Sequence, residues 1–159
     1  MNTILRSMIL SLCLACGGAL AAGDPGGSSV PQPQKDPVME KVAAATRVKD
    51  WPAAQAILKD ALARDPQNAD YHNLYAYTVR KGPNPDMSVV FMHYNQALAI
   101  DPKHRQAHEY LGEAYLMVGN VAKAKEHLAQ LDKICFLPCS EYSDLKKAIA
   151  DYEKKTASR

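Results

Sequence analysis

The sequence predicts an all-α fold made of three similar pairs of helices and one further helix. A related phrase recurs in the chain with offsets of 36 and then 34 residues. Apolar residues ahead of each phrase recur at spacings of three and four positions, which places them on one face of a helix. Asp-Pro pairs close the first two units, and proline cannot continue a preceding helix. The three phrases are Ala61-Leu62-Ala63-Arg64-Asp65-Pro66, Ala97-Leu98-Ala99-Ile100-Asp101-Pro102 and Leu131-Asp132-Lys133-Ile134.

Residues 1–21 are predicted to be a secretory signal peptide. Arg6 precedes an apolar stretch that begins at Ser7, and small residues around Ala21 offer a cleavage site. The apolar stretch is interrupted by two glycines and is shorter than the ~20 residues of a membrane-spanning helix. We therefore expect a periplasmic or secreted protein with no membrane span in the mature chain. The alternative is a bacterial lipoprotein anchored through Cys16.

Residues 22–35 are predicted to be a flexible linker. Gly, Pro, Ser and Gln dominate this stretch, and Val30 is its one large apolar residue. Such a composition provides no packed core.

The repeated units are predicted at about 36–67, 68–103 and 104–138. Asp36-Pro37 is typical of an N-cap followed by a first-turn proline, and therefore opens the first unit. The turn between the two helices of the second unit, residues 82–86, is longer than usual and accounts for the 36-residue offset. The second helix of each unit carries an apolar face, at Ala54, Leu58 and Ala61, at Val90, Tyr94 and Ala97, and at Ala124, Leu128 and Leu131.

The third unit has the most legible pattern: Leu111-Gly112, Tyr115, Gly119 as a C-terminal stop, Ala124 and Leu128. On these residues the chain resembles the tetratricopeptide repeat (TPR) family, as a small exported bacterial member, over about 100 of its 159 residues. The resemblance implies an α-solenoid of antiparallel helix pairs. It also implies that Gly112 lets the two helices of the third unit approach closely.

Residues 139–159 are predicted to be a C-terminal capping helix and tail. The helix has an apolar face at Tyr142, Leu145, Ala148, Ile149 and Tyr152. Ser140 is its predicted N-cap. A stacked array needs such a helix to cover its last apolar surface.

Composition and motifs argue against several classes of function. The net charge of +2 comes without a basic stripe, so no nucleic-acid partner is expected. The sequence lacks a Gly-rich phosphate loop, a nucleophile elbow and a zinc-protease helix. His104 and His108 are four residues apart, but no third ligand adjoins them. We expect neither an enzyme nor a protein with a metal or another cofactor.

Cys135 and Cys139 flank a turn, because Pro138 disfavours helical geometry at the residue before it. In an oxidising compartment a structural disulfide is the preferred interpretation, with the use of fixing how the capping helix docks. Two alternatives stay open: a Cu(I) site on the two thiolates and a thiol-redox site.

The TPR resemblance implies a non-catalytic scaffold that binds a peptide or helix of an envelope protein in the concave groove of the first helices. Within it, Asn73 and Arg80 are similar to part of the clamp by which some TPR domains hold a carboxylate, and we expect Tyr77 and Arg80 to be presented to the partner. Self-association through the same face is an alternative. The predicted groove residues are Arg47, Asn73, Tyr77, Arg80, Lys81, Glu109, Glu113, Leu116 and Met117.

Overall fold

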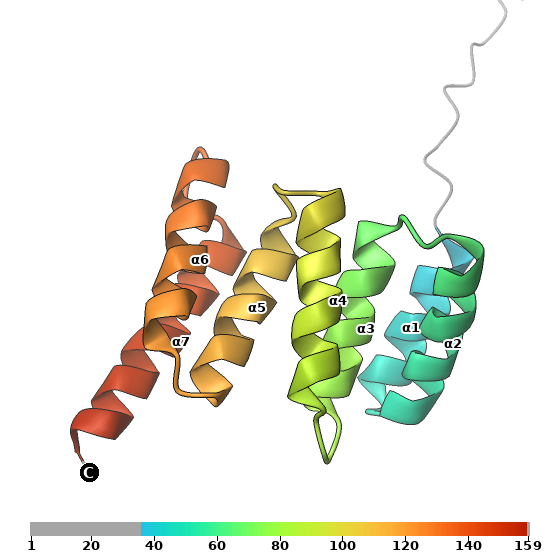
Figure 1. Ribbon diagram of the computed structural model, residues 1–159, viewed down its shortest axis with the longest axis horizontal. Helices are drawn as coiled ribbons and strands as arrows, with labels where there is room; N and C mark the ends of the chain where they lie inside the picture. Colours follow the sequence, from blue (N-terminus) through green and yellow to red (C-terminus); the bar gives the residue numbers. More distant parts are fainter. Residues whose placement is uncertain (1–35, 159) are drawn as a thin grey trace, which may run out of the picture. The chain divides into compact units, whose positions relative to one another are not determined.

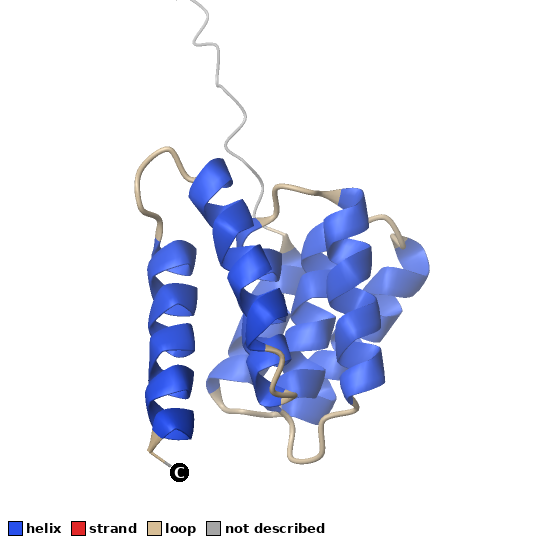
Figure 2. Cartoon of the chain, turned by 60° about the vertical axis from the view of Figure 1, so that its left-hand side comes forward, coloured by secondary structure: helices blue, strands red, loops and turns tan. Residues whose placement is uncertain are grey.

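The structure is a computed structural model that describes residues 36–158. The signal peptide predicted at 1–21 and the linker predicted at 22–35 lie outside these residues. Between residues 36 and 158 the chain forms helices joined by short loops, without a strand (Figure 2). None of these helices combines the length and the apolar character needed to cross a membrane.

Three antiparallel helical hairpins stand side by side, and a seventh helix follows them (Figure 1). The first helix of each hairpin packs against the second, and the pairs follow one another in chain order. The predicted all-α architecture is therefore confirmed. The helices are α1 (Pro37–Arg47), α2 (Trp51–Arg64), α3 (Ala69–Lys81), α4 (Met87–Ile100), α5 (Arg105–Met117), α6 (Val121–Ile134) and α7 (Ser140–Ala157).

Polar caps fix where α1 to α6 begin. In each, the side chain of the residue before the helix accepts a hydrogen bond from a backbone N–H of the first turn, which would otherwise lack a partner. The capping residues are Asp36, Asp50, Asn68, Asp86, His104 and Asn120.

The start of α7 differs from the prediction. Its N-cap is Cys139, which makes no side-chain capping bond, and Ser140 is already the first helical residue. The Ser140 hydroxyl instead donates to the Glu141 carboxylate at 3.2 Å. The predicted N-cap role of Ser140 is therefore wrong by one residue.

The second helices supply much of the core, on the faces that their apolar spacing predicts. Small and large side chains alternate there, so that neighbouring helices interdigitate. The fully buried members are Ala54, Leu58, Ala61, Val90, Tyr94, Ala97, Ala124 and Leu131.

Gly112 provides a close approach for α7. A Cβ at this position would lie 2.6 Å from Cδ2 of Leu145, on α7. Leu145 is fully buried and belongs to the core cluster at the C-terminal end. Gly112 therefore admits α7 against α5.

The turns between the two helices of each hairpin are of two kinds. Gly119, between α5 and α6, has φ of 78°, and Lys49, between α1 and α2, has φ of 58°. This left-handed conformation suits glycine and strains a residue with a side chain. The second hairpin has no residue of this kind and uses the longer loop between α3 and α4.

Candidate functional site

The candidate site lies on the face of the array formed by α1, α3, α5 and α7, called here the odd-helix face. It is the face that the resemblance predicts to be concave. An open groove of about 430 Å³ lies on it between α3, α5 and α7. Its lining residues are Arg80, Glu113, Leu116, Met117, Ala148 and Tyr152.

Four of the nine predicted groove residues line this groove, and they come from two different repeats. Leu116 and Met117, at the C-terminal end of α5, form its apolar part together with Ala148 and Tyr152 of α7. Met117 is half exposed, at 51% of the residue. Ala148 and Tyr152 are not among the predicted groove residues, because their apolar spacing indicates a face of α7 that covers the core, and they do pack against the core cluster there.

Arg80 is not presented to solvent as the sequence analysis expected. Only 7% of the residue is exposed. Its Nε donates to the Tyr94 hydroxyl at 3.2 Å, and a terminal nitrogen lies 2.8 Å from a Glu113 oxygen. The guanidinium carbon also lies over the rings of Tyr77 and Tyr110, at 5.7 and 5.5 Å. Arg80 is thus held inside the wall of the groove, and the expectation of a free gripping cation is wrong.

Three other predicted residues, Tyr77, Lys81 and Arg47, do not line the groove. Tyr77 is half-buried between two other aromatic rings. Its ring centre lies 6.2 Å from that of Trp51, which it meets edge-on, and 4.9 Å from that of Tyr110. Lys81 is exposed, with its ammonium 6.0 Å from the centre of the Tyr77 ring. Arg47 is exposed at the end of α1 and does not line the groove.

Asn73 is fully buried, and both polar atoms of its amide lack a hydrogen-bond partner. The sequence predicts that Asn73 hydrogen-bonds the backbone of a bound peptide. Because the amide is buried, the helices around it would have to move for the peptide to reach it. The sequence could not show this burial, because the repeat pattern gives the face of the helix but not the neighbours that cover it.

Glu109 is a buried carboxylic acid at the position of α5 that corresponds to Asn73 in α3. Burial is the main cause that raises its pKa to about 7, and the nearby Glu113, Asp144 and Glu141 raise the pKa further. Arg80 acts in the opposite direction but is already paired with Glu113. The α5–α7 part of the odd-helix face therefore carries acidic groups, one of which is partly protonated near neutral pH.

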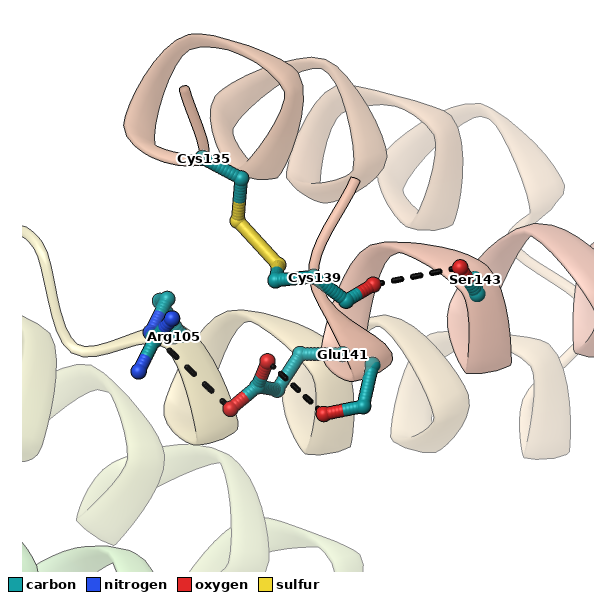
Figure 3. Close-up of a disulfide and its surroundings, with 6 residues drawn as sticks. Arg105, Cys135, Cys139, Glu141 and Ser143 are labelled. Carbon is teal, nitrogen blue, oxygen red and sulfur yellow. Dashed lines mark hydrogen bonds and ion pairs between the residues drawn. A yellow bond between two sulfur atoms is a disulfide. The ribbon is translucent and has the colours of Figure 1, made fainter. Parts of the chain in front are cut away.

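Cys135 and Cys139 are joined by a disulfide at the end of α6 and the start of α7 (Figure 3). Next to it, Glu141 of α7 faces Arg105 of α5, with 3.9 Å between the charged groups. The disulfide closes a short loop in which Phe136 is fully exposed. Because both sulfurs are bonded to each other, neither is a thiolate that could bind Cu(I).

His104 and His108 do not act together. His104 caps α5 through Nδ1 and places Nε2 at 3.1 Å from Asp70 on α3. His108 contacts His127 on α6 instead. Within residues 36–158, no group of three or more His, Cys, Asp or Glu side chains is placed to hold a metal ion.

Comparison with known proteins agrees with the fold. No protein-family model matches the sequence, and no curated protein sequence matches it. Among solved structures, the TPR domain of Sgt2 from Aspergillus fumigatus is similar, with a TM-score of 0.65 and 20% sequence identity. The similarity covers 80% of this chain and 82% of the Sgt2 domain. The described part of the chain thus has the fold of a TPR domain: an all-α solenoid of three helical hairpins with a seventh helix at its end.

Proposed function

We propose that this protein is a non-catalytic scaffold that binds a polypeptide segment of another protein in the groove between α3, α5 and α7. The observation that supports it most is the groove itself, in which Met117 and Tyr152 offer apolar surface above the buried Leu116 and beside the Arg80–Glu113 pair. Apolar anchors surrounded by polar groups are typical of protein interfaces.

The rigidity of the groove wall favours recognition of a partner in a fixed shape. The Arg80 side chain is held by Tyr94, Glu113 and two aromatic rings, so binding would cost little ordering of this side chain. An extended segment or a helix with one apolar side chain would place that side chain on Leu116 and Met117. The acidic groups of α5 and α7 would then lie beside it.

We further propose that the chain is exported and works in an oxidising compartment such as the periplasm, with its partner in the cell envelope. The supporting features are the signal-like sequence of residues 1–21 and the Cys135–Cys139 disulfide. Mass spectrometry of the protein from its native host tests this, with a new N-terminus near residue 22 expected. An uncleaved Met1 would contradict export, and a lipid-modified Cys16 would show that the exported chain is a lipoprotein.

The groove is tested by site-specific crosslinking in the native host. A photo-crosslinking residue replaces Met117, and in a matched control it replaces Met92, which is similarly exposed at 58% but lies on α4. We expect a defined crosslinked polypeptide from position 117 only. Crosslinking of the same polypeptide from both positions, or from position 92 alone, would overturn the groove as the binding site.

A further inference from the structure

Two pairs of histidines occupy equivalent places in the second and third hairpins. Nδ1 of His72 on α3 lies 2.8 Å from Nδ1 of His93 on α4. Nδ1 of His108 on α5 lies 2.9 Å from Nδ1 of His127 on α6. The proposed groove uses neither pair.

The other ring nitrogen of each first histidine is held by the backbone. Nε2 of His72 lies 3.1 Å from the carbonyl oxygen of Pro66, and Nε2 of His108 lies 3.1 Å from that of Pro102. Because a carbonyl oxygen only accepts, Nε2 carries the hydrogen, and Nδ1 of a neutral ring presents its lone pair to the partner histidine. Metal-binding histidines are oriented in this way, by a hydrogen bond from the second nitrogen to a carbonyl or carboxylate.

The two pairs differ in their access to solvent. The His72–His93 pair lines a cavity of about 330 Å³, together with Gln67, Gln96 and Met92. In the other pair, His108 is buried and the ring of Tyr115 stacks on His127 with 5.6 Å between the ring centres. An ion with its coordinated water can therefore reach the first pair more easily than the second.

The two Nδ1 atoms are close enough to become neighbouring ligands of one ion. An ion at about 2.0 Å from two nitrogens that are 2.8 Å apart would hold them at roughly 90°, as neighbouring ligands of a tetragonal site. Cu(II) prefers this arrangement and has the highest affinity for nitrogen ligands among the divalent first-row metals.

We propose that His72 and His93 form a Cu(II) site, with water from the cavity completing the coordination. This proposal goes beyond the scaffold function and does not depend on it. On binding, the hydrogen bond between the two Nδ1 atoms breaks, and both rings turn until each Nδ1 lone pair points at the ion. His93 gives its Nδ1 proton to water in the cavity and takes up a proton from water at Nε2, so that both rings stay neutral.

The test titrates the full exported chain with CuCl2 at pH 7.5, following heat by calorimetry and the copper signal by electron paramagnetic resonance. The expected result is one Cu(II) per chain, with hyperfine coupling to two imidazole nitrogens. His93→Gln should weaken binding at least tenfold. The repeat-equivalent His127→Gln is the matched control and should leave binding unchanged.

Three results would overturn the proposal: a wild-type spectrum without imidazole nitrogens, unaltered binding by His93→Gln, or an equal loss in His127→Gln. Circular dichroism checks that each variant keeps its helices. If His93→Gln does not fold, the wild-type spectrum and the His127→Gln titration still decide between the two pairs.

Discussion

Glu109 carries a carboxyl group in a place that disfavours its charge. It is 8% exposed, and three other acidic side chains contribute to a pKa of about 7, compared with an ordinary value of 4.5. The folded protein therefore holds a proton on Glu109 at pH values where the unfolded chain has lost it. The contribution of this group to stability is complete below pH 4.5 and is lost as the pH rises through 7.

Glu109→Gln is expected to stabilise the protein at alkaline pH, because the amide cannot ionise. The gain in the free energy of unfolding should be roughly 1–3 kcal/mol at pH 8 and near zero at pH 4. Urea unfolding at both pH values measures it, with the exposed Glu40→Gln as control. A variant that is less stable than the wild type at pH 8 would show that the carboxylate form has a stabilising role.

Arg80 shows that a repeat pattern does not determine whether a single side chain is exposed or buried. The pattern places Arg80 on the odd-helix face, and the structure does the same. Its burial depends on Glu113, Tyr94 and Tyr110, which come from other helices. The positions of these three residues in the sequence do not indicate that they contact Arg80. The exposure of Arg80 could therefore not be predicted from the sequence.

The contact between Gly112 and Leu145 predicts a strong coupling between two residues. Gly112→Ala should destabilise the protein by about 1–2 kcal/mol, since the new Cβ would lie 2.6 Å from the Leu145 side chain. After Leu145→Ala the space is free, and adding Gly112→Ala should be neutral or stabilising by up to ~1 kcal/mol. A double-mutant cycle in urea measures this coupling, and additive effects would contradict the contact.

Element boundaries were predictable where a local chemical signal marks them. Asp36, Asp65-Pro66, Asp101-Pro102 and Gly119 all stand at the helix ends that the sequence predicts. α7 is the exception. Because its N-cap Cys139 makes no side-chain bond, the polar signal at Ser140 misplaced the cap by one position.

The left-handed turns offer a paired test of two hairpins. Gly119→Ala should destabilise the protein by about 1–2 kcal/mol, because an alanine is strained at φ of 78°. Lys49→Gly relieves the same kind of strain between α1 and α2 and should be neutral or stabilising by up to ~1 kcal/mol. Thermal unfolding of both variants measures whether each substitution raises or lowers the stability of the protein. Equal destabilisation by both would exclude backbone strain as the cause.

The disulfide is expected to hold α7 against the rest of the array. Replacing Cys135 and Cys139 by Ser together should lower the free energy of unfolding by at most ~2 kcal/mol, since the closed loop is short. In this double variant, the backbone amides of α7 should exchange hydrogen faster than in the wild type, and the amides of α1 to α4 should exchange at nearly the same rate. The wild type treated with dithiothreitol is the control and should behave like the double variant. Unchanged exchange in α7 after reduction would contradict this role.

At the scale of the whole molecule, α7 has two tasks. Leu145 and Ile149 are buried in the core, and Ala148 and Tyr152, which pack against that core cluster, also line the groove. The sequence predicted the array and the helices that form its odd-helix face. The groove required knowing how α7 packs on α5, which depends on Gly112 and the disulfide.

The most direct measurement of the central proposal is the affinity of the crosslinked partner segment, made as a peptide, for two charged variants. Met117→Asp places a charge in the groove, and Met92→Asp places one at a similarly exposed position on α4. Calorimetry should show at least tenfold weaker binding for Met117→Asp, because burying an unpaired carboxylate costs more than 1.4 kcal/mol. Binding to Met92→Asp should equal that of the wild type. Equal affinities for the two variants, or a loss confined to Met92→Asp, would contradict recognition in this groove.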